Sequence, residues 1–307
     1  MSGVHEIPDL QRAKSCDQVE ACGTNLYLCV FHSLAYWLHV RYFFHIGYFG
    51  KNYHGWQRQP NVLSIQEVLE MAFEKIIKVR TTVFGCGRTD ASVHASQYFF
   101  HADFTVEWDF DLVTRLNHVL PPDIAVFDMI QVEELQNARF DAVKRTYDYF
   151  LHTYKDPFLT DTSAYYPVGP LDVCAMQKAV SLLPLYEDYC AFCKVPKSYL
   201  HTRCRIYNAN LYIGERQDRL RFQISSDRFL RGMIRAIMGK LLEVGMGRVS
   251  VEEFEHHLIS KQLPDQLKLA YPQGLFLSKV TYPYLDLPAK SEFSGHANRA
   301  EASWVML

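Results

Sequence analysis

Arg41-Tyr-Phe-Phe-His-Ile-Gly-Tyr-Phe49 is the stretch at which a regular pattern first emerges in this 307-residue chain. Every second residue from Tyr42 to Tyr48 is apolar, and these residues alternate with Phe43, His45, Gly47 and Phe49, so that neither face carries a charged side chain such as Lys or Glu. A strand that is apolar on both faces is typical of the interior of a sheet, because each face must be covered by other parts of the protein. This stretch therefore predicts a central strand.

The residues after this strand predict a helix and then two further strands. Ser64-Ile-Gln-Glu67 is typical of a capping box, since the serine and glutamate side chains can accept hydrogen bonds from free N–H groups at a helix start. We expect the helix to reach about Lys78. Thr81–Cys86 and Gln97–Val106 predict strands, so Gly87–Ser96 is expected to be the loop between them.

A second helix and a fourth strand complete the first half. Leu112–Leu120 predicts the helix, which Pro121-Pro122 stops because proline has no N–H group to donate. Ala125–Val132 predicts the strand. The order in this half is therefore strand, helix, strand, strand, helix, strand.

The second half repeats this order less regularly. Its expected elements are a strand at Arg145–Thr153, a helix at Asp172–Leu183, a hairpin of Arg203–Ile213 with Arg219–Ser225, a long helix at Phe229–Val244 and a last strand at Gly274–Tyr282. Two split βαβ units of this kind are typical of ferredoxin-like halves. We therefore expect an α+β fold in which one half (residues 41–137) and a second half (residues 138–288) enclose a central cleft.

The two ends of the chain differ from this pattern. Residues 1–40 have no clean period and are either a genuine N-terminal extension or sequence upstream of a start nearer Arg41. The apolar stretch Leu26–Val40 is short for a membrane span, which needs about 20 residues, and it lacks the features of a signal peptide, so we expect no membrane insertion. Residues 289–307 also lack periodicity and are expected to form a mobile tail.

The composition is that of an ordinary globular protein, with 49% hydrophobic and 14% aromatic residues. This content excludes disordered, collagen-like and small disulfide-bonded classes. Eight scattered cysteines without a secretory leader favour reduced thiols and a cytoplasmic location.

The charge is balanced overall, at -2, but it is unevenly distributed. Four acidic residues lie between Lys197 and Arg248, against these basic residues: Lys197, Arg203, Arg205, Arg216, Arg219, Arg221, Arg228, Arg231, Arg235, Lys240 and Arg248. Such a concentration is typical of a surface that contacts a phosphate backbone, although a merely solvated face has the same composition.

The segment from Gly85 to His94 combines glycines with an arginine and an aspartate, Arg88 and Asp90. Glycines allow a tight turn, and an arginine beside a carboxylate keeps it ionised and oriented, as a nucleophile or a base requires. The alternative is an ordinary surface ion pair in a hairpin turn.

Another cluster, Cys190-x2-Cys193-x7-His201-x2-Cys204, has four residues of types that bind zinc. The spacing between its two pairs is shorter than in most zinc sites. A zinc-dependent RNA-binding module is therefore an alternative reading of the chain, while our preferred assignment contains no metal.

Gly87-Arg-Thr-Asp-Ala-Ser-Val-His-Ala95 resembles the GRTDAGVHA motif of the TruA-type tRNA pseudouridine synthases, with Ser92 in place of the usual glycine. Tyr53–Gln59, Arg139–Tyr149, Phe229–Arg235 and Gly274–Leu277 resemble further family motifs, in family order. The resemblance covers about residues 41–288. If position 92 needs a positive φ, serine costs about 1 to 2 kcal/mol relative to glycine, and we expect activity to survive this cost.

The resemblance implies a role for five residues. Asp90 corresponds to the nucleophile, which attacks the target nucleoside at the sugar C1′ or the base C6. Tyr147 corresponds to the tyrosine that stacks on the uracil and is a candidate for removing the C5 proton. Arg235 is expected to pair with the aspartate and Leu277 to line the base pocket. Arg88 is expected to help extrude the base or to hold its place, because a paired base hides the atoms under attack.

The resemblance also implies the substrate and the assembly. The expected function is the isomerisation of uridine to pseudouridine at positions 38 to 40 of the tRNA anticodon stem-loop, by a homodimer that needs no cofactor. Arg228 and Arg231 are expected to lie with Arg235 on one stripe of a helix, where they contact phosphates without reading sequence. The alternative is a catalytically inactive tRNA-binding protein of the same fold.

Overall fold

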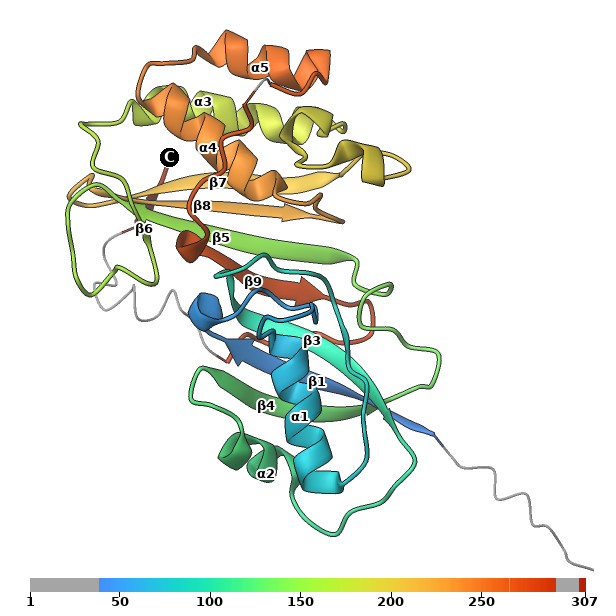
Figure 1. Ribbon diagram of the computed structural model, residues 1–307. Helices are drawn as coiled ribbons and strands as arrows, with labels where there is room; N and C mark the ends of the chain where they lie inside the picture. The colour runs from blue at the N-terminus through green and yellow to red at the C-terminus, as the bar shows by residue number, and fades with distance from the viewer. Residues whose placement is uncertain (1–38, 265, 291–303) are drawn as a thin grey trace, which may run out of the picture. The chain divides into compact units, whose positions relative to one another are not determined.

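The computed structural model describes residues 39–264, 266–290 and 304–307, which belong to one compact unit (Figure 1). The extension expected over residues 1–40 therefore lies almost entirely outside the described residues. Within these ranges, no helix combines the length and the apolar character that crossing a membrane requires.

One large mixed sheet organises the described residues. Its ten strands are β1 (Val40–Tyr48), β2 (Phe84–Gly85), β3 (His94–Phe104), β4 (Ile124–Val132), β5 (Lys144–His152), β6 (Ala164–Tyr165), β7 (Ile206–Gly214), β8 (Arg219–Ser226), β9 (Leu275–Thr281) and β10 (Trp304–Met306). The order across the sheet is β10-β7-β8-β5-β9-β3-β1-β4, with β2 beside β3 and β6 beside β5. This mixed architecture agrees with the general class that the sequence predicts.

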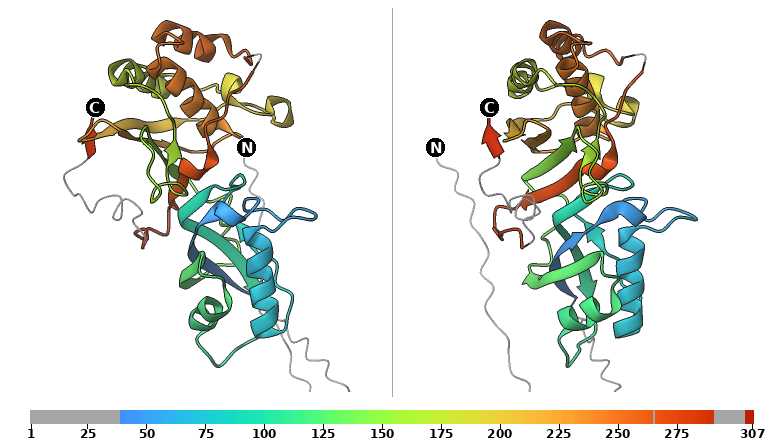
Figure 2. Two further views of the ribbon diagram at one scale, coloured as in Figure 1. Left: turned by 60° about the vertical axis from the view of Figure 1, so that its left-hand side comes forward. Right: turned by 90° about the vertical axis from the view of Figure 1, so that its left-hand side faces the viewer.

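Two groups of helices accompany different parts of the sheet. The helices are α1 (Ile65–Ile77), α2 (Leu112–Val119), α3 (Val173–Leu182), α4 (Met233–Gly245) and α5 (Val251–Ser260). Figure 2 shows α1 and α2 beside β1, β3 and β4, and α3 and α4 beside β5, β7 and β8, while α5 packs against α3 and α4. Short 3₁₀ turns include η1 (Gly50–Asn52) and η5 (Pro272–Gly274). The apolar faces of both groups belong to one continuous core of buried residues.

Strand β9 joins the two groups of strands. It pairs in parallel with the start of β3, where Ala95 lies opposite Leu277. On its other side it pairs antiparallel with β5, where Tyr147 lies opposite the same leucine. The segment that precedes β3 is therefore brought next to the middle of β5, although the two are far apart in the sequence.

Several local predictions are confirmed. Strand β1 lies between β3 and β4, as its two apolar faces predict. Helix α1 begins after Ser64, whose hydroxyl accepts a hydrogen bond of 3.3 Å from the Glu67 N–H group. This is one half of the expected capping box, and the second half, from the Ser64 N–H group to the Glu67 side chain, is not formed. The next two N–H groups of the helix start, those of Ile65 and Gln66, donate to the carbonyls of residues 55 and 56.

Three boundaries differ from the prediction. The strand expected at Thr81–Cys86 is reduced to the two residues of β2, and β3 already begins at His94. The long helix begins at Met233 instead of Phe229, because Gly232 has a φ of +74°, which an α-helix does not accommodate. Helix α5 was not predicted.

The tail expected at residues 289–307 is also corrected in part. Residues 291–303 lie outside the described residues. Trp304–Met306, however, forms β10 and pairs antiparallel with β7, opposite Tyr212–Gly214. The final segment of the chain therefore contributes a strand to the sheet, which its lack of periodicity did not indicate.

Candidate active site

The loop between β2 and β3 carries Asp90 and is held against the segment that follows β1. Within this loop, the Thr89 carbonyl accepts a hydrogen bond from the Trp56 N–H group (3.3 Å), and the Ser92 N–H group donates to the Tyr53 carbonyl (3.1 Å). Gly55 lies under the loop with a φ of +86°, and a Cβ atom there would come within 2.2 Å of the Thr89 carbonyl oxygen. The absence of a side chain at this glycine lets the two backbones approach closely.

Asp90 forms an ion pair with Arg235 of α4. Nη1 of the arginine lies 3.2 Å from Oδ2 of the aspartate. The Arg235 backbone and Nε group are also bonded to Ala270, by hydrogen bonds of 2.9 and 2.7 Å, which fix the direction of the guanidinium group. The side chain of Asp90 remains 34% exposed. One carboxylate oxygen is thus held by the protein while the group as a whole stays accessible.

Arg88 does not take the place that the sequence predicts for it beside Asp90. Its side chain is exposed, and among the described residues no hydrogen bond or ion pair joins it to the aspartate. The charge partner of Asp90 is Arg235, from a distant part of the chain, which is the residue that the resemblance implies for this pairing. Arg88 is therefore free to contact a bound molecule.

Tyr147 and Leu277 lie side by side on neighbouring strands and are both buried. The ring of Tyr147 meets Phe229 edge-on, with 5.2 Å between centroids. Burial, and to a smaller extent the charge of Asp90, raises the pKa of Tyr147 above its ordinary value. The phenol is therefore neutral at physiological pH.

Arg228 and Arg231 are not on the helical stripe that the sequence predicts, because both precede α4. The Asp227 carboxylate accepts a hydrogen bond of 2.7 Å from the Arg228 N–H group and so holds this segment outside a helix. The Arg228 guanidinium lies 5.7 Å from the centre of the Tyr199 ring, and the Tyr199 hydroxyl accepts a hydrogen bond from the Arg231 N–H group (2.9 Å). Arg231 itself is exposed.

Arg145, which lies two positions before Tyr147 on β5, is not among the site residues predicted from the sequence. Its side chain donates to the backbone carbonyls of Cys86, Arg139, Ala142 and Asp227. Alternate residues of a strand point to the same face. The two-residue spacing therefore indicated that Arg145 shares a face of the strand with Tyr147. The bonds themselves depend on segments that only the fold brings together.

Cys86 lies at the base of the Asp90 loop and is fully buried. Its N–H group donates to the Phe99 carbonyl (2.8 Å). Burial raises the pKa of the Cys86 thiol to about 11. The residue therefore acts as part of the core at physiological pH and not as a reactive group.

The cysteine cluster has no arrangement suited to a metal. Among residues 39–264, 266–290 and 304–307, no three His, Cys, Asp or Glu side chains are placed to hold one ion together. Cys193 and Cys204 are buried, and burial raises the pKa of Cys204 to about 12. Zinc needs thiolate ligands, so the geometry offers no support for the zinc-dependent alternative.

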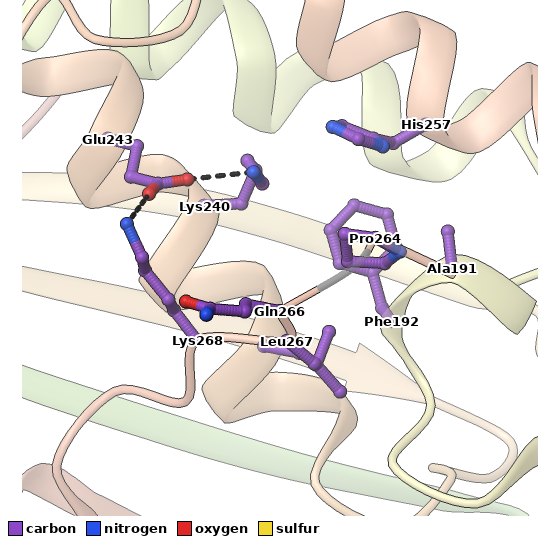
Figure 3. Close-up of a pocket in the computed structure, with 10 residues that line it drawn as sticks. Ala191, Phe192, Lys240, Glu243, His257, Pro264, Gln266, Leu267 and Lys268 are labelled. Carbon is purple, nitrogen blue, oxygen red and sulfur yellow. Dashed lines mark hydrogen bonds and ion pairs between the residues drawn. The ribbon is translucent and has the colours of Figure 1, made fainter. Parts of the chain in front are cut away.

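A small pocket beside α4 contains none of the candidate residues (Figure 3). Glu243 lies at its edge and is bonded to both Lys240 and Lys268 at 2.7 Å. The free space is about 10 Å³, which is room for about one water molecule. This pocket is therefore too small to accept a nucleotide base.

Comparisons with known proteins point to one family. A family model described as tRNA pseudouridine synthase matches residues 186–283. The chain is 42% identical over 246 residues to tRNA pseudouridine synthase A of Bacteroides fragilis, which covers 79% of this chain and 96% of that protein. It is 38% identical over 247 residues to tRNA pseudouridine synthase A of Porphyromonas gingivalis, and the aligned residues cover 80% of this chain and 98% of that protein.

The sheet, the Asp90 loop and these similarities define a pseudouridine synthase. The chain belongs to the tRNA pseudouridine synthase A family. The resemblance that the sequence motifs indicated is thereby confirmed.

Ser92 adopts the left-handed backbone conformation, with a φ of +61°, at the position where the family motif has glycine. Its hydroxyl makes a long hydrogen bond of 3.4 Å to the Lys51 carbonyl.

We predict that Ser92→Gly raises the free energy of unfolding by about 1 kcal/mol, because glycine adopts this conformation without strain. Urea unfolding measures the change, and Ser92→Ala, which keeps the Cβ atom, is the control. A gain in both variants would show that the hydroxyl and not the backbone is responsible.

Two buried histidines on β3 predict a loss of stability in mild acid. Nδ1 of His94 accepts a hydrogen bond from the Gly50 N–H group (2.9 Å), so Nε2 carries the proton and donates to the Gln273 carbonyl (3.2 Å). His101 accepts a hydrogen bond from the Ala138 N–H group (3.2 Å). Desolvation by burial lowers the pKa of both imidazoles to about 4.

The unfolded chain binds protons at these histidines near pH 6.5, whereas the folded protein does not until about pH 4. The stabilisation that comes from keeping these histidines neutral is therefore complete above pH 6.5, and it is lost as the pH falls toward 4. At pH 5.5 each should lower the free energy of unfolding by about 1 kcal/mol. Urea unfolding at pH 7.5 and pH 5.5 tests this. His101→Gln should reduce the difference, whereas replacing the exposed His118 should not, and equal pH dependence in all three proteins would contradict the prediction.

Proposed function

We propose that this protein converts uridine to pseudouridine in tRNA, at positions 38 to 40 of the anticodon stem-loop, with Asp90 as the nucleophile. The observation that carries the proposal is the Asp90–Arg235 pair, in which a half-exposed carboxylate is oriented by a fixed guanidinium next to a buried tyrosine. The names of the relatives, tRNA pseudouridine synthase A, support the same reaction.

The reaction needs a nucleophile and a proton relay but no external reagent. The bond between C1′ of the ribose and N1 of uracil breaks, and a bond between C1′ and C5 forms. The proton on C5 is lost, and N1 gains one. Because the product is an isomer, atoms and electrons balance without a cofactor. Asp90 would attack C1′ or C6 with its accessible carboxylate, while Arg235 holds the other oxygen.

Tyr147 and Leu277 are suited to hold the uracil. Their adjacent positions on β5 and β9 give an aromatic ring and an aliphatic side chain at one place near Asp90. The raised pKa of Tyr147 favours stacking as its role in the free protein. For Tyr147 to remove the C5 proton as well, the phenol would have to lose its own proton in the complex.

Arg88 is suited to extrusion of the base. It is exposed on the same loop as Asp90, and the carboxylate is already neutralised by Arg235. A planar guanidinium can enter the space that a flipped base leaves and can stack on its neighbours. We assign Arg88 to this step.

Arg228 and Arg231 form the start of a phosphate-binding surface. The Lys194 N–H group donates to the Arg231 carbonyl (3.0 Å), which ties a second exposed basic segment to the arginines. Residues 194–207 contain four Lys or Arg and no Asp or Glu. Because this surface lies on the chain that leads to Arg235, it would position tRNA at the site.

The assembly and the finer architecture are also proposals. We infer a cytoplasmic homodimer whose subunit consists of two ferredoxin-like halves, residues 41–137 and 138–288, on either side of a cleft. The helix groups that accompany different strands of the sheet support this division. The inactive tRNA-binding alternative is disfavoured because the candidate catalytic pair is formed.

We predict that Asp90→Ala lowers the rate of pseudouridine formation at least about a thousandfold, because no other group can replace the nucleophile. Release of tritium from C5-labelled uridine in an unmodified tRNA transcript measures the rate, and a filter-binding assay measures tRNA affinity, which should be retained. Release by both proteins would show that Asp90 is misassigned. Binding without release by the parent would favour the inactive alternative.

We also predict that Arg231→Gln weakens tRNA binding and lowers the slope of log affinity against log salt concentration by about one, since one phosphate contact is removed. Affinities measured at several salt concentrations test this. Arg216→Gln, at an exposed arginine in the turn between β7 and β8, is the matched control and should change neither quantity. Equal slopes for Arg231→Gln and the parent would exclude Arg231 from the interface.

A further inference from the structure

The guanidinium group of Arg145 uses all its N–H donors on backbone carbonyls. Nε and Nη2 both donate to Cys86, at 3.2 and 2.7 Å. Nη1 donates to Ala142 (3.2 Å) and to Asp227 (3.1 Å), and Nη2 also donates to Arg139 (2.8 Å). A guanidinium group has five N–H bonds, so no donor remains for a phosphate or a base.

The four carbonyls come from three segments that are distant in sequence. Cys86 directly precedes the Asp90 loop, and Asp227 precedes the segment that leads to Arg235. Arg139 and Ala142 belong to the connection between β4 and β5. The side chain therefore joins both members of the Asp90–Arg235 pair, through their backbones, to the strand that carries Tyr147.

The energetics of the cluster depend on its geometry. Burying part of a cation is costly, and here neutral carbonyl dipoles supply the compensation. Together the five bonds offset that cost, and a planar fork is suited to reach oxygens on both of its edges. A lysine has three donors on one atom and cannot reproduce this pattern.

We propose that Arg145 is a positioning residue for the isomerisation: it sets the distance between the Asp90 loop, the Arg228–Arg235 segment and Tyr147. The proposal rests on the proposed function for its catalytic consequence. Arg145 does not touch the substrate. Position 145 requires an arginine because its side chain binds backbone carbonyls, and not because it binds RNA.

The test compares Arg145→Lys and Arg145→Ala with a matched arginine variant, Arg41→Lys. Arg41 is also largely buried and bonds to the Asp103 carboxylate (2.7 and 2.8 Å) and the Gln136 carbonyl (2.9 Å), but it lies at the far end of β1 from the Asp90 loop. It therefore controls for the general loss of a buried arginine. Tritium release gives kcat and KM, and filter binding gives the Kd for tRNA.

We expect Arg145→Lys to lower kcat about 100-fold while KM and the Kd for tRNA change less than about threefold. Arg41→Lys should leave kcat within about threefold of the parent. Guanidinium chloride at low millimolar concentration should restore part of the kcat of Arg145→Ala, whereas ammonium chloride should not. Unchanged kcat in Arg145→Lys, or equal losses in Arg145→Lys and Arg41→Lys, would overturn the proposal.

Hydrogen exchange separates this proposal from the proposed function. In Arg145→Lys the amides of Trp56, Ser92 and Val93, which bond the Asp90 loop, should exchange at least about tenfold faster than in the parent, while those in the middle of β3 should not change. If the parent releases no tritium but this local acceleration is seen, the reaction is misassigned and the positioning role stands. If protection of these amides is unchanged, Arg145 does not hold the loop.

Discussion

The pairing of β9 with both β3 and β5 is the constraint on which the candidate site depends. The parallel contact places Leu277 beside Ala95, just after the Asp90 loop, and the antiparallel contact places it beside Tyr147. Backbone hydrogen bonds between strands fix such distances more tightly than loops can, because each strand is held by its neighbours on both sides. The segment that follows the Asp90 loop, from the first part of the chain, and Tyr147, from the second, are thereby kept in register.

Side-chain bonds reinforce this register at the same end of the sheet. His94 links the Gly50 backbone to the Gln273 carbonyl just before β9, and its ring lies between Phe49 and Phe276. The Asp90–Arg235 pair and the carbonyl contacts of Arg145 cross the same boundary. The links differ in chemistry: a neutral imidazole, an ion pair and a cation bound by dipoles. All three kinds of link act in addition to the backbone pairing of the strands.

Local patterns in the sequence predicted the elements whose residues lie together in the chain. The alternation in β1 and the Ser64 cap of α1 were of this kind, and both appear in the structure. The resemblance to family motifs supplied the candidate residues, and the comparisons confirm the family. The start of α4 was predicted wrongly, because the apolar spacing continues through Phe229 while Gly232 turns the backbone away. The resemblance implied Arg235 as the partner of Asp90, which no local pattern indicates. The carbonyls around Arg145 could not be predicted, since they depend on contacts between distant segments.

The burial of Cys86 has a consequence for the conditions in which the site can work. Oxidants and alkylating reagents attack the thiolate form of accessible cysteines. Cys86 has no exposed surface, and its pKa is raised to about 11. A sulfur atom thus lies at the base of the loop that carries Asp90, yet the surrounding core shields it from peroxide and disulfide exchange. Cys86 is therefore protected from oxidation as long as this part of the fold stays closed.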